Sequence, residues 1–226
     1  MNREQLFDQI ETPPSLAEIA FQAIKKAILE KRLVPDVIYN EKVLADELGF
    51  SKTPVHEALT TLSVKGFVTI LPRKGFQVRA LSAKNIQDMY EFRTTLERAV
   101  VEKIVPDMTD ESIDHLKSII DRIASTDDPT QLGNLDQEFH NYLASLTGNL
   151  YIIEALDNLW ELCAWIAVRA MTNDARNHEP MYREHLNIWE GLKARDTERT
   201  IQAMDGHLRK AEERWLDQHR SEAESE

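Results

Sequence analysis

One carboxylate and three imidazoles occupy positions from which they could bind a single metal ion: Asp136, His140, His185 and His207. Asp136 and His140 are four residues apart, so they project from the same face of one predicted helix. His185 and His207 lie on or beside the apolar faces of two other predicted helices. We therefore expect all four side chains to point into the interior of a helical bundle.

This set of side chains has the chemistry of a metal site. A buried carboxylate is costly unless it is paired or bound to a metal. Three histidines and one aspartate suit a divalent transition ion, zinc first, with nickel and manganese as alternatives, and leave positions for water or a ligand oxygen. A single histidine on an apolar face is more often a hydrogen-bonded core residue, so the prediction depends on all four residues together.

Two arginines are candidates for binding an anionic effector in the same bundle. Arg93 lies at the margin of an apolar stripe, where its guanidinium could bind a carboxylate through two hydrogen bonds. The alternative is a surface ion pair between Arg93 and Glu97, four residues later. Arg169, near the end of the most apolar predicted helix, is a second candidate of the same kind.

A different chemistry is indicated by the segment SKTPVHEALTTLSVKGFVTILPRKGFQV, residues 51–78. Its first half predicts a helix that Ser51 caps by accepting a backbone N–H bond. A shorter helix over 41–48, with Val43 facing inward, precedes it and ends at Gly49. Two short helices joined in this way form a helix-turn-helix, whose second helix enters the major groove. The side chains expected to face DNA lie opposite the apolar stripe: Lys52, Thr53, His56 and Thr60.

The second half of this segment predicts a β-hairpin wing. Residues 67–71 and 76–79 are rich in β-branched and aromatic side chains, and the residues between them are typical of a turn. Arg73, Lys74 and Gly75 therefore lie at a hairpin tip, where the two cations can bind phosphate. Residues 51–80 carry five basic side chains and one acidic side chain, a local net charge of +4.

Charge is distributed unevenly along the 226 residues. Residues 1–80 carry 11 Lys and Arg against 10 Asp and Glu, whereas residues 81–226 carry 16 against 29. The second part would repel DNA, so we expect contact with DNA to be confined to the first. The single cysteine excludes an intrachain disulfide, and the sequence has no signal peptide or membrane-length apolar run. These features suit a cytoplasmic protein.

The fold predicted from these patterns is mainly α. Residues 13–80 form a winged helix-turn-helix domain with a small β-hairpin wing, and residues 81–220 form an all-α helical-bundle ligand-binding domain. Strand patterns vanish after the wing, and Pro and Gly positions divide the rest into helices over 83–105, 109–125, 129–147, 149–172, 177–194 and 196–218.

The chain resembles the GntR family of bacterial transcription regulators, in its FadR-like branch with an FCD C-terminal domain. The matching segments are LADELGFSKTPVHEALTTLSVKGFV with PRKGFQV, then FRTTLE at 92–97, DQEFH at 136–140, EH at 184–185, and the stretch over 196–208 that ends in GHL. The resemblance implies a homodimeric regulator, usually a repressor, that binds a palindromic double-stranded DNA operator. It also implies a metal bound at Asp136, His140, His185 and His207, and a small carboxylate effector that meets the metal with help from Arg93.

The sequence departs from the family pattern at three positions. Lys52 and His56 stand where the family usually has arginine, the residue that reads guanine through two hydrogen bonds, so the usual operator is not expected. Asp36 stands where the family favours glycine, although aspartate tolerates the left-handed conformation better than most residues.

Two other functions compete with an effector-controlled regulator. A metal-dependent, hydrolase-like enzyme could use the open position of the metal site to activate water, but no general base accompanies the four ligands. A regulator whose metal is purely structural is the other alternative. We therefore predict that the chain is not an enzyme.

Overall fold

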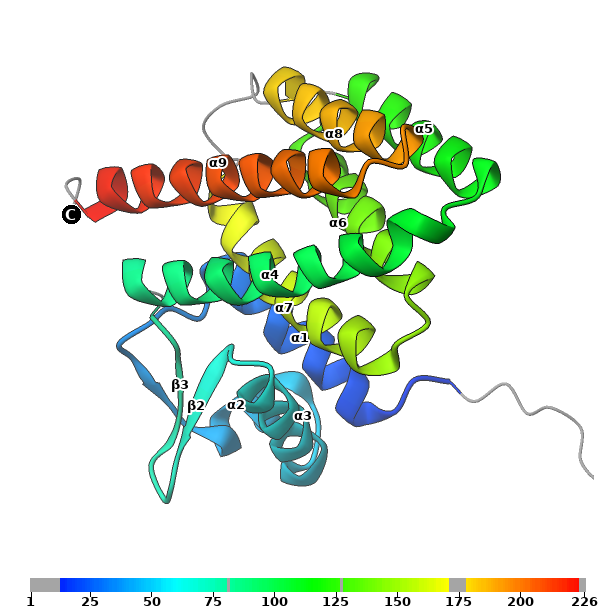
Figure 1. Ribbon diagram of the computed structural model, residues 1–226. Coiled ribbons are helices and arrows are strands. Elements are labelled where there is room, and N and C mark those ends of the chain that lie inside the picture. Colours follow the sequence, from blue (N-terminus) through cyan, green and yellow to red (C-terminus); the bar gives the residue numbers. More distant parts are fainter. Residues whose placement is uncertain (1–12, 81, 127, 171–177, 224–226) are drawn as a thin grey trace, which may run out of the picture. The chain divides into compact units, whose positions relative to one another are not determined.

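The computed structural model describes residues 13–80, 82–126, 128–170 and 178–223 (Figure 1). The chain divides into two compact units, Met1–Ala80 and Leu81–Glu226. Helices dominate the described residues, and the strands all lie in the first unit, which confirms the predicted mainly α fold with a small wing. None of the described helices is both long and apolar enough to cross a membrane.

Residues 13–80, the described part of the first unit, form three helices and a three-stranded antiparallel sheet in the order β1-β3-β2. Phe67 and Phe76 are fully buried in its core beside apolar side chains of the helices, and α3 packs against α1 and α2. Its elements in chain order are α1 Leu16–Leu29, β1 Ile38–Tyr39, α2 Glu41–Leu48, α3 Lys52–Val64, β2 Val68–Leu71 and β3 Gly75–Val78.

Two local predictions for the short helices were wrong. Ser51 is the N-cap residue of α3, but its side chain makes no capping hydrogen bond. An N-cap hydroxyl usually accepts from the second or third residue of the helix, and the third residue here is Pro54, which has no N–H. Val43 is 55% exposed, because α2 turns Ala45 to the core instead. The predicted end of α2 is confirmed, since Gly49 adopts a φ of 69° there.

The turns of the first unit contain residues in the left-handed region. Asp36 has a φ of 65°, the conformation for which glycine is favoured, so aspartate accepts the geometry of that turn. At the wing, Gly75 has a φ of 127°, and a Cβ added to it would lie 2.0 Å from the carbonyl oxygen of Tyr39. Only glycine permits this close approach of β1 to β3.

The second unit is a helical bundle around one apolar core. Its longest helices, α4 and α9, pack against each other, and α8 and α5 continue the packing to α6 and α7 (Figure 1). Ser82 caps α4 by accepting from the Asn85 N–H. The elements are α4 Ala83–Ile104, the short η1 Val105–Asp107, α5 Asp110–Ala124, α6 Pro129–Leu146, α7 Leu150–Ala170, α8 His178–Lys193 and α9 Thr197–Ala223.

Candidate metal centre and nucleic-acid interface

The exposed face of α3 carries the side chains predicted to meet DNA. The apolar stripe of α3 from Val55 to Leu62 is buried, whereas Val64 at the end of the helix is exposed. Lys52, Thr53, His56 and Thr60 are also exposed. The Thr60 hydroxyl donates to the His56 carbonyl oxygen at 2.8 Å, as threonine commonly does within a helix. The face therefore presents one ammonium, one imidazole and two short hydroxyl side chains to solvent.

Glu41, at the start of α2, lies beside this face, although the sequence patterns did not single it out. Its side chain is 13% exposed, and its carboxylate is 3.3 Å from His56 Nδ1 and 3.9 Å from Lys52 Nζ. A carboxylate in this position orients the imidazole and the ammonium that a DNA partner would meet. His56 lies fifteen residues after Glu41 in the sequence, so their contact depends on how α2 packs against α3 and does not follow from sequence spacing.

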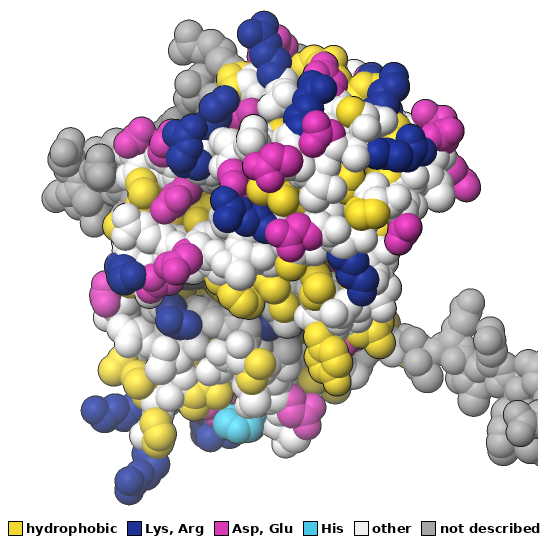
Figure 2. Space-filling model, in the orientation of Figure 1, with side chains coloured by type: hydrophobic (Ala, Val, Ile, Leu, Met, Phe, Trp, Pro, Cys, Tyr) yellow, Lys and Arg dark blue, Asp and Glu magenta, His cyan; other side chains and the backbone are white. Residues whose placement is uncertain are grey.

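The wing tip carries exposed cations. Arg73 and Lys74 are exposed in the turn between β2 and β3, while Gly75 is half-buried at the start of β3. Figure 2 shows Lys and Arg side chains gathered at the end of this hairpin. Two mobile cations on a projecting turn suit contact with the phosphate backbone of DNA rather than with base edges.

The four candidate metal ligands meet in the interior of the second unit. Asp136 and His140 come from α6, His185 from α8 and His207 from α9. One ligand atom from each residue lies within 4.8 Å of the others. The three histidines are buried, and the Asp136 side chain is 18% exposed. Helical spacing on α6 aligns the first two residues, and packing of the three helices brings in the other two.

In His140 and His207, the hydrogen bond made by Nδ1 fixes the orientation of the ring and shows which ring nitrogen carries the proton. His140 Nδ1 donates to Glu97 Oε2 at 2.6 Å, and His207 Nδ1 donates to Glu184 Oε2 at 3.0 Å. Burial raises the pKa of both carboxyl groups, but their histidine and arginine partners more than offset this and hold each pKa at about 2. An ionised carboxylate can only accept, so each Nδ1 carries the proton and each Nε2 is a bare lone pair.

The third ring is oriented in the same way, with Nδ1 towards an acceptor and Nε2 towards the centre. His185 Nδ1 lies 2.8 Å from the Met181 carbonyl oxygen, which can only accept a hydrogen bond. His140 Nε2 and His207 Nε2 then face each other at 3.2 Å, and His185 Nε2 faces Asp136 Oδ1 at 3.0 Å. The first contact brings two lone pairs together, and the second joins His185 Nε2 and Asp136 Oδ1, for which the described residues provide no other hydrogen-bond partner.

Such a convergence of acceptors fits a cation. Nitrogen and oxygen atoms bonded to one zinc ion at ~2.0–2.1 Å lie roughly 3 to 3.4 Å apart. Two of the separations here, 3.2 Å and 3.0 Å, match this range, and Asp136 Oδ1 lies 3.9 Å from Nε2 of both His140 and His207. Burial lowers the pKa of His140, and it lowers the pKa of His207 to about 3, so both rings are neutral and able to bind metal. Burial alone would raise the pKa of Asp136, but its close contact with His185 Nε2, more than any other neighbour, holds that pKa well below its usual range.

Comparison with known proteins identifies both units. Residues 16–78 match the family model of the bacterial regulatory proteins of the gntR family, and residues 88–210 match the model of the FCD domain. The chain belongs to the GntR family and carries an FCD domain. It is a DNA-binding transcription regulator, and its named relatives are regulators rather than enzymes, which confirms the prediction that it is not an enzyme.

Individual relatives agree with this assignment over most of the chain. YdhC, an HTH-type transcriptional regulator of Bacillus subtilis, is 27% identical over 192 residues, covering 83% of this chain and 85% of YdhC. The Nta operon transcriptional regulator of Aminobacter aminovorans is 30% identical over 179 residues, covering 76% and 80%. The solved structure of McbR from E. coli shares the fold, with a TM-score of 0.74 over 92% of this chain and 100% of McbR at 19% identity.

Arg93 of this GntR-family chain is buried beside the candidate metal ligands. Its Nε donates to Glu97 Oε1 at 2.9 Å, so the predicted pair exists, but at 2% exposure Arg93 is not on the surface. Its guanidinium carbon lies 3.9 Å from the ring centroid of Trp160, whose ring in turn contacts His140. Among the described side chains, Arg93 Nη2 has no hydrogen-bond partner. The side chain of Arg169 lies outside the described residues.

Proposed function

We propose that this GntR-family regulator is a cytoplasmic homodimeric repressor that binds a palindromic operator through α3 and the wing. In this proposal, a small organic acid controls operator binding by binding at a divalent metal ion held by Asp136, His140, His185 and His207. Zinc is the metal we favour, with nickel and manganese as alternatives. The acid shifts the population of conformations, which changes the spacing of the two recognition helices across the dimer.

The observation that carries this proposal is the convergence of three imidazoles and Asp136 Oδ1, with a buried donor without a hydrogen-bond partner, Nη2 of Arg93, in the same unit. A divalent cation satisfies the four acceptors. The carboxylate of an acid can then bind the cation with one oxygen and Arg93 with the other, which supports Arg93 as the effector-binding residue. The metal, when bound, supplies a Lewis-acidic position for that oxygen.

The charges around the centre support an anionic effector that binds after the metal. Glu97 pairs with Arg93 and Glu184 pairs with Arg214, so among these carboxylates and guanidinium groups Asp136 leaves a net charge of −1. A divalent cation changes this to +1. A monocarboxylate then neutralises the centre, whereas without the metal it would meet repulsion.

A thermal-shift screen of small organic acids, with and without zinc, tests the effector site. We expect a specific acid to raise the melting temperature only in the zinc-loaded protein, because a ligand of the folded state stabilises it by mass action. Arg93→Gln should abolish that shift, and Arg98→Gln, a control at an exposed arginine of the same helix, should retain it. If no acid acts with any of the three metals, or Arg93→Gln leaves the shift intact, the effector site is wrong.

Operator binding is tested separately. Gel-shift titration with the promoter region should show tight binding by wild type and weaker binding by the variant Lys52→Ala with Arg73→Ala. Equal binding by both would refute the proposed DNA face. A reporter under the same promoter should rise when the gene for this protein is deleted, as repression requires, and a fall would indicate activation.

A further inference from the structure

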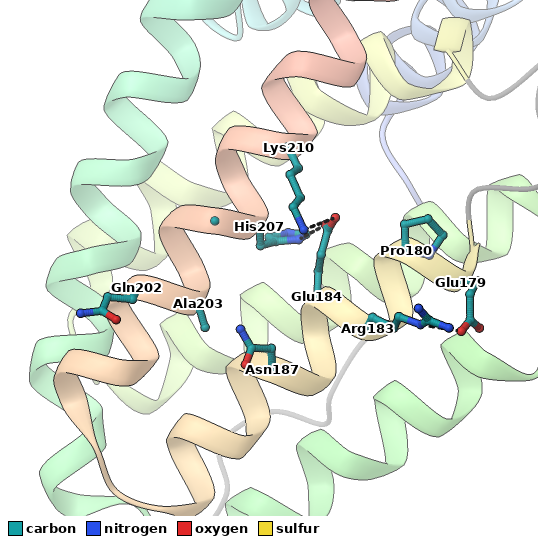
Figure 3. Close-up of a pocket in the computed structure, with 10 residues that line it drawn as sticks. Glu179, Pro180, Arg183, Glu184, Asn187, Gln202, Ala203, His207 and Lys210 are labelled. Carbon is teal, nitrogen blue, oxygen red and sulfur yellow. Dashed lines mark hydrogen bonds and ion pairs between the residues drawn. The ribbon is translucent and has the colours of Figure 1, made fainter.

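A second ligand site lies on the outer side of α8 and α9. A groove of about 470 Å³ runs between these helices, and a volume of this order accommodates a small metabolite. Figure 3 shows Lys210 reaching from α9 towards Glu184 on α8, with Asn187 further along α8. Ala203 and Gly206 on α9 also line the groove, and their small side chains help to leave space there.

The positive charge of this groove is only partly neutralised. Glu184 accepts from both terminal nitrogens of Arg214 at 3.0 Å and from His207 Nδ1. Lys210 Nζ lies 3.8 Å from Glu184 Oε1, beyond hydrogen-bond distance, and within the described part of the chain no other ion pair is formed by Lys210. One carboxylate thus faces two cations, which leaves a net charge of +1.

The other charged pair of the groove does not offset this excess. Arg183 Nε donates to Glu179 Oε1 at 2.7 Å, so these two lining residues neutralise each other. Asn187 adds an exposed amide, which can donate to a ligand oxygen. An oxyanion that binds the three N–H donors of Lys210 would therefore complete the charge balance of the groove.

We propose that this groove, which His207 and Glu184 also line, binds the carboxylate or phosphate group of a small metabolite on the Nδ1 side of His207, away from its metal-facing Nε2, with Lys210 as its principal cation. Glu184 couples the two sites, because it contacts Lys210 on the groove side and holds His207 through Nδ1. An anion that neutralises Lys210 strengthens the hold of Glu184 on the imidazole. A more basic imidazole binds metal more tightly, so the anion raises metal affinity. Anion binding in the groove does not require the metal centre, whereas the coupling between anion binding and metal binding rests on the proposed function.

Gly206 offers a direct way to fill the groove. A Cβ added to this glycine meets no atom within 4 Å, so a larger side chain enters open space. Gly206→Leu should block the ligand, and Gly206→Ala is a milder variant in case leucine impairs folding. Lys210→Ala removes the cation. Arg209→Ala is the matched control, because Arg209 is an exposed cation on the same helix that pairs with Glu213 and does not line the groove.

Calorimetric titration of the full-length, metal-free chain with inorganic phosphate tests the groove, and the groove variants separate it from the cations of α3 and the wing, which they leave unchanged. We expect phosphate to bind wild type and Arg209→Ala equally, and to bind Lys210→Ala and the Gly206 variants at least about tenfold more weakly, the loss of one charge-assisted contact. The proposed anion site would be refuted if phosphate did not bind to wild type, or if it bound equally to wild type and to all variants.

The coupling is measured by zinc competition with a chelating dye, with and without phosphate. Phosphate should raise zinc affinity about fivefold in wild type, the lower end of typical coupling between two sites, and leave it unchanged in Lys210→Ala. If wild type binds phosphate and zinc independently, the coupling through Glu184 is wrong and the groove stands. If zinc does not bind at all, the proposed metal centre fails, independently of the phosphate result.

Discussion

Replacing Glu97 by glutamine removes the charge that holds two buried groups. Glu97 accepts from Arg93 Nε at 2.9 Å and from His140 Nδ1 at 2.6 Å, and it is 1% exposed. Its pKa is lowered from 4.5 to about 2, which corresponds to roughly 3 kcal/mol of stabilisation of the charged form. Breaking a buried ion pair costs about 3–5 kcal/mol, because the remaining charge is uncompensated. Both routes give the same order of magnitude.

We therefore expect Glu97→Gln to lower the melting temperature of the metal-free protein by roughly 6–12 °C, at about 2–4 °C per kcal/mol. Circular dichroism at neutral pH measures this change. The sign of the pH dependence follows from the lowered pKa: the stabilisation is complete above pH 4.5 and is lost as the pH falls towards 2. Glu102→Gln, at an exposed carboxylate of the same helix, should melt like wild type.

A double variant separates the two partners of Glu97. If the uncompensated charge of Arg93 dominates the cost, Arg93→Met combined with Glu97→Gln should be more stable than Glu97→Gln alone, since glutamine can still accept from His140 through its carbonyl oxygen. A double variant less stable than Glu97→Gln would show that this charge is not the main cost. A single variant that melts like wild type would refute the whole account of the buried pair.

Three further predictions concern the metal shell and the wing. Glu184→Gln should weaken zinc binding by about 10–100-fold, the usual cost of losing a carboxylate that orients a ligating histidine, as measured by competition with a chelating dye. Gly75→Ala should destabilise the wing and weaken operator binding in a gel shift, because its Cβ would lie 2.0 Å from Tyr39 O at a φ of 127°. Arg73→Ala with Lys74→Ala should weaken DNA binding regardless of sequence and reduce the salt dependence of log K by about two for each protomer bound, measured by fluorescence anisotropy at several salt concentrations.

Much of the fold follows from sequence patterns because its elements carry strong local signals. Helical periodicity, breaks at Pro and Gly, and the turn at residues 72–75 are sufficient to predict the helix-turn-helix, the wing and the helices that follow. The misassigned face of α2 shows where local patterns fail. A helix of eight residues has few apolar positions, so packing against α3 decided that Ala45 rather than Val43 is buried.

The candidate metal ligands could be selected from the sequence because each lies on an apolar helical face, where a polar side chain needs a partner. The carboxylates that fix their tautomers could not be selected. Glu184 adjoins His185 in the sequence, yet it holds His207, twenty-three residues later. Glu97 similarly holds His140 from another helix. Such pairings depend on how helices pack, and no local pattern encodes them.

Arg93 shows that burial determines what an arginine and a glutamate four residues apart contribute to a protein. An arginine and a glutamate four residues apart form an ion pair on an exposed helix and on a buried one alike. On the surface such a pair contributes little, and its donors are satisfied by water. Buried against Trp160, the same pair leaves Arg93 Nη2 without any partner among the described residues, and a buried charged donor is costly until something accepts from it. In the proposed function, an anion supplied from outside the chain removes that cost, and the difference in this gain between two conformations of the regulator shifts their populations.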